Sequence, residues 1–351
     1  MKKIILMLVL AICLSVCVFG EKSVSDLNPN FRNLMDQALK GVNSYPNEYR
    51  DREKPFSLFF FSDVHGQKKI VSRLMDFYNE NTEYFDDALC CGDLVESWSG
   101  NDWTYWGQIK GAEKVLLAIG NHDMRPNDKD WTMMPEKQAF DQYFAPYIAN
   151  WNVKNEAGKT YYFKDYAEKK IRLITVNNNL SGDENNAQLE WFGNMLTDAR
   201  LKGYTVVAAA HIPPVTYPVT IESNWSEPDR DEGDYRWGEP YCKKVKEFKN
   251  DGGKFACWLS GHTHSDYLYV SKLYPEQLCF VIGSATIWGP AYSTNLRIEG
   301  TQSADLADAV VIDTTSKTLK AIRIGSHYDR YLRPINALSI NYETMKIISE
   351  W

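Results

Sequence analysis

Five short apolar runs in this chain each end at a cluster of polar residues, and this recurring pattern constrains the fold more than any other sequence feature. The runs cover residues 58–61, 88–91, 115–119, 205–210 and 255–259. Apolar residues at helical spacing follow the first run between Ile70 and Tyr78, and precede the fourth between Leu189 and Ala199. Strands that alternate with helices in this way predict an α/β fold.

The last third of the chain instead predicts β-hairpins. Apolar runs cover residues 278–282 and 310–324, and Thr314-Thr315-Ser316-Lys317 provides a turn inside the second. No internal repeat or low-complexity stretch appears beyond residue 30, so we predict one continuous domain over residues 56–330. An N-terminal segment over residues 21–55 precedes it, and a C-terminal tail over residues 331–351 follows it.

Residues 1–20 have the pattern of a secretory signal peptide. Lys2 and Lys3 precede an apolar run from Ile4 to Phe19, and Gly20 follows as a small residue suited to cleavage. A membrane anchor is the alternative, but a span needs about 20 apolar residues and this run is shorter. We therefore predict a secreted protein, extracellular or periplasmic, with no stable membrane span after cleavage near Gly20.

The net charge argues against a nucleic-acid partner. The chain carries a formal charge of −7, and the predicted cleavage removes two lysines and no acidic residue, which makes it −9. Such an acidic surface repels the phosphate backbone of DNA or RNA. The sequence leaves the oligomeric state open.

Five cysteines remain after the predicted cleavage, an odd number in a compartment where disulfides form. At least one must therefore stay unpaired. Cys90, Cys91 and Cys257 lie in apolar runs, which favours packing as small buried hydrophobic residues.

The polar clusters contain five of the six histidines in the chain. They are Asp63-Val64-His65, Gly92-Asp93, Gly120-Asn121-His122-Asp123, His211 and Gly261-His262-Thr263-His264. Because open α/β sheets bind ligands at the carboxyl ends of their strands, we expect these clusters to converge at one edge of the fold.

Histidine and carboxylate side chains in this pattern suit first-row divalent metals. Asp63 and His65 are two residues apart and can point to the same side, as can His262 and His264. Asp93 is the natural bridge between two ions, because a carboxylate offers two oxygens. We expect the glycine in three of the clusters to let the backbone bend sharply as each strand ends.

Taken singly, each cluster is weak evidence, because a lone Asp-x-His or a lone histidine is more often structural. The ordered set of D-x-H, G-D, G-N-H-D, H and G-H-x-H resembles the calcineurin-like metallophosphoesterase superfamily, over about residues 56–330. The resemblance implies a four-layer αββα sandwich with two mixed β-sheets, and two divalent metal ions such as zinc, manganese or iron. One ion would be held by Asp63, His65, Asp93 and His264, and the other by Asp93, Asn121, His211 and His262.

This donor set predicts hydrolysis of a phosphate ester by a hydroxide that bridges two metals. Two cations about 3.5–4 Å apart can lower the pKa of a bridging water and hold the phosphoryl oxygens for in-line attack. His122 is not needed as a ligand, so we predict that it acts as the general acid.

Asp123 and Glu96 are the candidate carboxylates for fixing the tautomer of His122. Glu96 occupies the position at which the related Ser/Thr protein phosphatases carry an orienting aspartate. A solvated loop acid is the alternative for Glu96.

Three branches of the superfamily are disfavoured. The Ser/Thr protein phosphatases have arginines where this chain has Ser97 and Ile119. The purple acid phosphatases have a tyrosine three residues after the bridging aspartate, where this chain has Glu96. The nucleases of the superfamily act on DNA inside cells, which fits neither the signal peptide nor the acidic composition.

We therefore predict an exported phosphoesterase that acts on a small-molecule or lipid-derived phosphate ester. Phosphodiesters are slightly favoured over monoesters, because no evident arginine clamp for a terminal phosphate dianion stands beside the motifs. The alternative is a non-catalytic binding or scaffold protein that retains the fold, which the presence of every metal position and of His122 disfavours.

Residues 213–240 form a polar stretch with little periodicity, although Trp225, Tyr235 and Trp237 interrupt it. This profile is typical of a functional loop, and we predict an ordered flap on the substrate side. A disordered insertion is the alternative. His327, the sixth histidine, is predicted to lie outside the metal site.

Overall fold

The computed structural model describes residues 27–40, 55–96, 103–125, 132–214, 218–221, 223, 236–286, 297, 302–326 and 336–350. The predicted signal peptide, much of the predicted flap and His327 lie outside these residues. Within the described ranges, no helix is long and apolar enough to cross a membrane.

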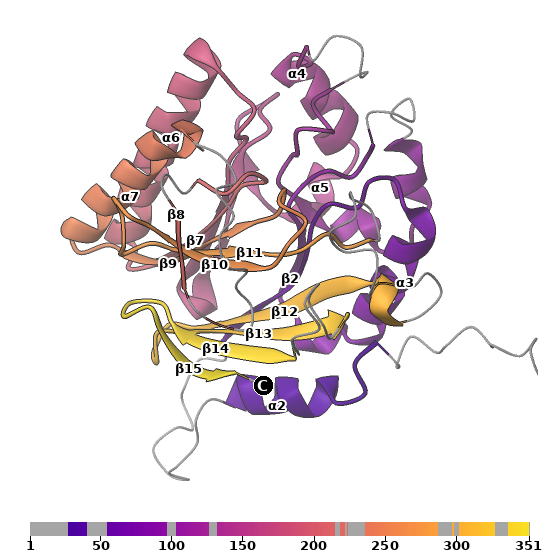
Figure 1. Cartoon of the computed structure of the whole chain (residues 1–351). Helices are drawn as coiled ribbons and strands as arrows, with labels where there is room; N and C mark the ends of the chain where they lie inside the picture. The colour runs from indigo at the N-terminus through magenta and orange to yellow at the C-terminus, as the bar shows by residue number, and fades with distance from the viewer. Residues whose placement is uncertain are drawn as a thin grey trace, which may run out of the picture.

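Two mixed β-sheets pack against each other and carry helices on their outer sides (Figure 1). The first sheet has seven strands in the order β15-β14-β13-β12-β1-β2-β3, and the second has eight in the order β4-β5-β6-β7-β9-β11-β10-β8. The strands of the first sheet are β1 (Phe56–Phe61), β2 (Asp87–Cys90), β3 (Leu116–Leu117), β12 (Leu306–Asp313), β13 (Thr318–Gly325), β14 (Ala337–Asn341) and β15 (Lys346–Glu350). Those of the second are β4 (Lys154–Asn155), β5 (Tyr162–Tyr166), β6 (Ile171–Thr175), β7 (Thr205–Ala209), β8 (Pro218–Thr220), β9 (Lys254–Ser260), β10 (Tyr267–Ser271) and β11 (Leu278–Val281). The α-helices are α2 (Phe31–Lys40), α3 (Lys68–Glu80), α4 (Glu136–Ala139), α5 (Ile148–Trp151), α6 (Gly182–Leu201) and α7 (Glu239–Asn250).

The aromatic run in β1 shows how the sequence sets the layers. Phe59 packs against Tyr78 of α3, with ring centroids 5.4 Å apart, whereas Phe60 approaches Phe280 of β11 at 6.2 Å. Successive strand residues point to opposite faces, so one face of β1 meets a helix and the other meets the second sheet. Burial of both faces explains why this run is continuously apolar instead of alternating.

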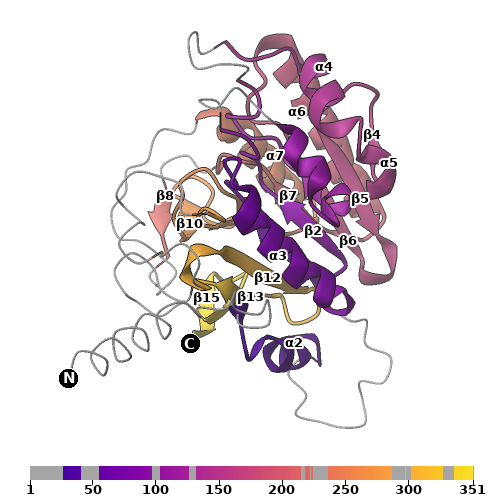
Figure 2. The same ribbon diagram turned by 90° about the vertical axis from the view of Figure 1, so that its right-hand side faces the viewer.

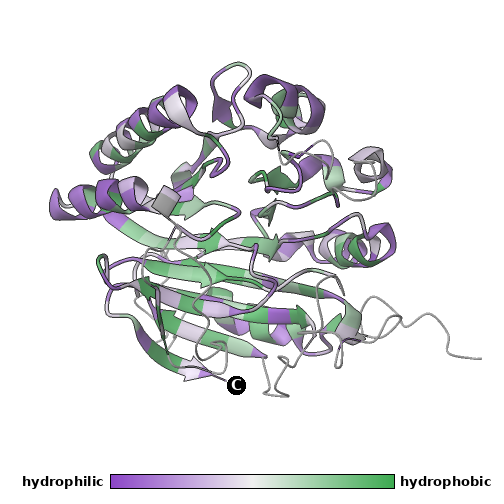
Figure 3. Cartoon of the chain, turned by 45° about the horizontal axis from the view of Figure 1, so that its top comes forward, coloured by the Kyte–Doolittle hydropathy of each residue, from purple (hydrophilic) through white to green (hydrophobic). Residues whose placement is uncertain are grey.

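The second sheet is covered in the same way by α6 and α7 (Figure 1). Trp258 of β9 stacks on Phe192 of α6 with ring centroids 5.8 Å apart. A view from the side shows α3 and α2 on the first sheet (Figure 2), and colouring by hydropathy shows mainly hydrophobic strands between more hydrophilic helices (Figure 3). The four-layer αββα sandwich with two mixed sheets is thereby confirmed.

Parallel pairing brings the carboxyl ends of the central strands together. In the first sheet β1 pairs with β2 and β2 with β3 in parallel, and in the second β7 pairs in parallel with β9. The five polar clusters follow directly after these five strands.

The fold also includes chain predicted to lie outside the domain. β14 and β15 fall within the residues predicted as a C-terminal tail, yet β14 pairs with β13 and extends the first sheet. α2, from the predicted N-terminal segment, packs on β13 of the same sheet. Elements on both sides of the predicted domain of residues 56–330 therefore pack with its first sheet.

The five cysteines after residue 20 are all buried and unpaired in the structure. For Cys90, Cys91 and Cys257 this agrees with the prediction that they pack as small hydrophobic residues. Burial is also the largest cause of the raised pKa of the Cys90 and Cys91 thiols, which keeps both neutral.

Candidate metal centre

The structure gathers the predicted ligands at the edge where the five central strands end. Three overlapping groups of side chains each place one donor atom per residue within 4.8 Å of the others. The groups are Asp63, His65 and His264; His65, Asp93 and His122; and Asp93, His211 and His262.

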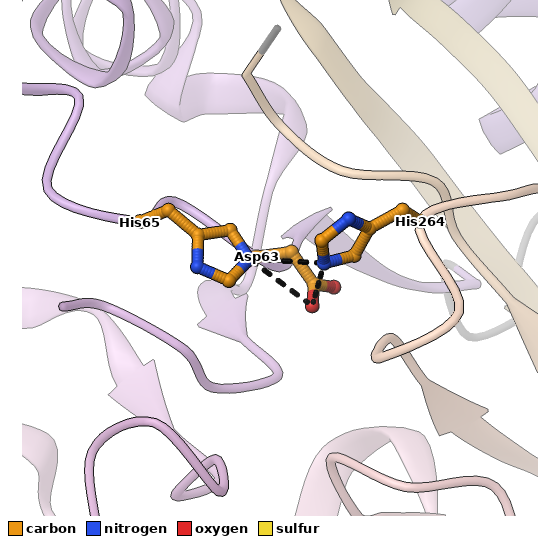
Figure 4. A group of neighbouring side chains, drawn as sticks. All are labelled: Asp63, His65 and His264. Atoms are coloured by element: carbon orange, nitrogen blue, oxygen red, sulfur yellow. Dashed lines mark hydrogen bonds and ion pairs between the residues drawn. The ribbon is translucent and has the colours of Figure 1, made fainter. Parts of the chain in front are cut away.

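The first group lies between the end of β1 and the loop after β9. Figure 4 shows the rings of His65 and His264 directed at the same carboxylate oxygen of Asp63. The two Nε2 atoms are 2.9 Å apart, and His264 Nε2 lies 3.3 Å from Asp63 Oδ1. Ligand bonds of about 2.1 Å around one cation place neighbouring donors about 3 Å apart, so this spacing fits a shared ion.

The second group is centred on His211, which is fully buried. Its Nε2 lies 3.1 Å from Asp93 Oδ2 and 3.0 Å from Asn121 Oδ1. The Nδ1 atom of His262 lies 3.3 Å from this His211 Nε2. On the other side of the ring, Nδ1 lies 2.6 Å from the Cys91 carbonyl oxygen and donates a hydrogen bond to it. That bond directs the Nε2 atom of His211 into the cluster as the metal-facing nitrogen.

Buried acids and histidines in the cluster shift one another's pKa values. Burial alone would raise the pKa of Asp63, but the hydrogen bond to His264 and its charge outweigh burial and lower that pKa to about 2. Burial likewise opposes a charge on His211, but the charge of Asp93 raises its pKa to about 9. His262 differs, because burial and the charge of His211 lower its pKa to about 4 and leave it neutral.

This donor set fits divalent cations. Two carboxylates, one amide oxygen and four imidazoles face one another with their acceptor atoms inward, an arrangement that needs protons or cations between them. Nitrogen and oxygen donors of this kind suit zinc, manganese or iron.

The residues in the cluster share an unusual backbone conformation. A positive φ, rare for residues other than glycine, occurs at five of the seven predicted ligands, with values from 49° to 70°. They are Asp63, His65, Asp93, His262 and His264. Strained backbone of this kind is typical of functional sites, where the surrounding structure enforces it.

The glycines before the ligands act in two different ways. Gly92 has a φ of +92°, in agreement with the sharp bend that we predicted for all three. Gly120 and Gly261 have no left-handed φ. A Cβ at Gly120 would collide with Asp93, and a Cβ at Gly261 would collide with Ser62. They therefore permit a close approach of neighbouring loops instead of a bend.

His122 lies at the edge of the cluster, with 21% of its side chain exposed. Its Nε2 is 4.0 Å from Asp93 Oδ2, and its Nδ1 is 3.1 Å from Glu96 Oε1. Burial alone would lower the pKa of His122, but the contact with Glu96 and the charge of Asp93 raise it. A histidine held in this way is suited to carry a proton at the rim of the site.

The two candidate orienting acids occupy different positions. Glu96 is buried and touches the ring of His122, which argues against a solvated loop acid. Asp123 accepts hydrogen bonds from the backbone N–H of Gly120 and of Val95, at 2.9 Å and 3.2 Å. It thus fixes the loop around Asn121, while Glu96 faces the ring.

Two features of the site were missed from the sequence. Glu96 Oε2 also lies 3.0 Å from Nδ1 of His65, so one carboxylate contacts two histidines. Ser284, in the loop after β11, donates a hydrogen bond from its hydroxyl to the Asp63 carbonyl oxygen at 2.8 Å. Neither contact has a sequence signal, because both join segments that meet only in the folded chain.

The sandwich and its cluster define a class of α/β proteins with a histidine- and aspartate-rich centre at the strand ends. A family model described as calcineurin-like phosphoesterase matches residues 56–266, and the chain belongs to this family. The resemblance predicted from the motifs is confirmed.

Curated relatives match part of the chain. Acid sphingomyelinase-like phosphodiesterase 3b from Homo sapiens is 26% identical over 193 residues, and the Mus musculus protein of the same name is 24% identical over 193 residues. Each match covers 50% of this chain and 40% of the relative. The chain therefore matches less than half of the length of these relatives.

Solved structures share the fold. A dimetal phosphatase from Danio rerio is 11% identical with a TM-score of 0.51, covering 82% of this chain and 99% of that chain. The purple acid phosphatase PPD1 from yellow lupin (Lupinus luteus) is 13% identical with a TM-score of 0.52, covering 82% and 54%. At these identities the likeness concerns the fold alone.

Proposed function

We propose that this protein is a binuclear metal-dependent phosphoesterase that hydrolyses a phosphate ester, with diesters favoured over monoesters. The observation that carries the proposal is the donor set, in which buried carboxylate, amide and imidazole groups from five loops face one another. One cation is assigned to Asp63, His65, Asp93 and His264, and the other to Asp93, Asn121, His211 and His262.

The metals and the protein have separate roles in this proposal. When bound, two divalent cations supply Lewis acidity that activates water and offsets charge on phosphoryl oxygens. Asp93 lies between the two sets of donors, and its Oδ1 accepts the backbone N–H of His122 at 2.9 Å. This hydrogen bond ties the proposed acid to the shared ligand.

His122 is the proposed general acid. Glu96 occupies the Nδ1 side of the ring, so Nε2 is the nitrogen that would deliver a proton to the leaving-group oxygen at the edge of the cluster. Asp123, through its backbone contacts, keeps the loop of Asn121 and His122 in place.

The preference for diesters has two supports. The curated relatives are named phosphodiesterases, although the match covers only 40% of their length. The sequence also has no evident arginine clamp for a terminal phosphate dianion beside the motifs. The proposed substrate is a small-molecule or lipid-derived phosphate ester.

Export is part of the proposal and has its own test. Its support is the basic and then apolar pattern of residues 1–20. N-terminal sequencing of protein recovered from outside the cell should give a start near Glu21. Recovery of Met1 on membrane-bound protein would contradict it.

The enzymatic proposal is tested by metal analysis together with hydrolysis. Protein purified without added metal should contain two first-row ions per chain. With manganese or zinc it should hydrolyse bis-p-nitrophenyl phosphate faster than p-nitrophenyl phosphate. Asp93→Asn should lose metal and activity, whereas the exposed Glu343→Gln should keep both.

Two other outcomes are informative. Faster hydrolysis of the monoester would reverse the preference for diesters. Metal-loaded protein without hydrolysis of any phosphate or pyrophosphate ester between pH 5 and 9 would favour the scaffold alternative.

A further inference from the structure

The turn that carries His262 and His264 has an unfavourable backbone. Both residues have a positive φ, 70° and 57°, although each has a side chain. Backbone of this kind persists only where surrounding contacts enforce it. The contacts that hold this turn therefore decide whether both imidazoles face the cluster.

Asp266, two residues after His264, fastens the end of this turn. Its Oδ1 accepts a hydrogen bond from Arg323 Nη2 at 2.7 Å and another from the backbone N–H of Gly283 at 3.2 Å. Arg323 lies on β13 of the first sheet and is fully buried. The ion pair thus connects a loop of the second sheet to a strand of the first.

The same contacts reach the other side of the cluster. Gly283, held by Asp266, precedes Ser284, whose hydroxyl donates to the carbonyl oxygen of Asp63. Ala285 adds a backbone hydrogen bond to the Ser62 carbonyl oxygen at 2.8 Å. Asp266 is therefore linked to both loops that supply the first group of ligands.

The burial of the Asp266–Arg323 ion pair favours a role in orienting the loop over a role in stabilising the fold. Removing two charges from water carries a desolvation cost, so a buried pair is weak evidence for stabilisation. The guanidinium group of Arg323 is further fixed by Asp308 Oδ1, which accepts from Nε at 2.8 Å. A planar group held on two sides orients its partner more strictly than a point charge does.

We propose that Asp266 and Arg323 form a positioning pair that fixes His262 and His264 for cation binding. The inference rests on the proposed function, since it assumes that both histidines bind metal. Arg323 lies outside residues 56–266, the part of the chain that the family model matches. The C-terminal strands would thus contribute to metal retention as well as to the sheet.

The test compares two buried ion pairs. Arg172 on β6 is also fully buried and also pairs with two carboxylates, Asp165 and Asp198, so Asp165→Asn is the matched control for Asp266→Asn. Zinc affinity is measured by competition with a chelator, and thermal unfolding is measured without metal. Asp266→Asn should weaken zinc binding by about 10–100-fold, the usual effect of losing a group that orients metal ligands. Asp165→Asn should bind zinc within about twofold of the wild type.

The outcomes separate this inference from the proposed function. If Asp266→Asn lowers the unfolding midpoint as Asp165→Asn does but keeps wild-type zinc affinity, the pair is structural and the inference is wrong. If Asp266→Asn does not fold, Arg323→Lys replaces it, because lysine keeps the charge and loses the planar fork. Weaker zinc binding by Arg323→Lys supports the inference, and unchanged binding overturns it. A wild-type protein that binds neither zinc nor manganese would instead contradict the proposed function.

Discussion

Glu96 contacts two histidines with different proposed roles. Its two carboxylate oxygens lie 3.0 Å from Nδ1 of His65 and 3.1 Å from Nδ1 of His122. Burial alone would raise the pKa of Glu96, but its contacts with these histidines lower it to about 2. It therefore stays ionised near neutral pH and directs the Nε2 atom of both rings towards the cluster.

Substitutions at Glu96 and His122 should have different effects. His122→Gln is expected to lower kcat by about 10²–10⁴-fold, the usual contribution of a general acid, and to leave the metal content unchanged. Glu96→Gln is expected to lower kcat and also to weaken metal binding by about 10–100-fold, because it stops orienting a ligand. Steady-state kinetics at saturating metal and chelator competition measure the two effects. Equal metal affinity in both variants would show that Glu96 acts on His122 alone.

Among the elements, the sequence predicted those with a continuous apolar run or a clear helical spacing. β1, β2, β7 and β9 follow from continuous apolar segments, and α3 and α6 from helical spacing. The missed strands are short or weakly apolar, such as β4, which has two residues, and β14, which has three apolar residues among five. These strands form because a neighbouring edge offers hydrogen bonds, and a local pattern does not contain that information.

The C-terminal strands should be needed for stability. Ile340 on β14 is fully buried, whereas Ile348 on β15 is 57% exposed. Ile340→Ala is therefore expected to reduce the free energy of unfolding by about 2–5 kcal/mol. Ile348→Ala should change it by less than about 0.5 kcal/mol. Denaturant unfolding measures both changes. If Ile340→Ala changed the free energy of unfolding as little as Ile348→Ala, residues 337–350 would lie outside the cooperative fold.

Asp308 on β12 should make stability depend on pH. Burial raises its pKa from 3.8 to about 7, although Arg323 opposes this shift. Between these values the folded state keeps a proton that the unfolded state loses, so this contribution is full below about pH 4 and disappears as the pH rises through 7. Asp308→Asn removes that contribution. The unfolding midpoint of the wild type minus that of Asp308→Asn should therefore fall between pH 4 and pH 7, and a constant difference would contradict the shifted pKa.

For the whole molecule, the site combines both sheets. Asp63, Asp93 and Asn121 follow strands of the first sheet, and His211 and His264 follow strands of the second. The sequence could predict this convergence because parallel strands end at a common edge. It could not predict the contacts of Glu96, Ser284 and Asp266, which depend on how the loops close over that edge.

Metal removal should destabilise the entire protein. A ligand that binds only the folded state stabilises it by about 2.7 kcal/mol at a concentration 100 times its Kd. Chelation is thus expected to lower the unfolding midpoint, and zinc or manganese should raise it again progressively as the metal concentration increases. Calorimetry with and without chelator measures the shift. No shift for the wild type would contradict cation binding in the folded state.

The contact between His65 and His264, whose positions in the chain are 199 residues apart, has a consequence for assembly. Neither half of the cluster is complete before the two sheets have docked, so a chain that has formed only one of them offers an incoming ion too few partners to retain it. Uptake of metal during refolding would then follow docking of the sheets instead of guiding it. The time at which metal is taken up would therefore report when the two sheets dock.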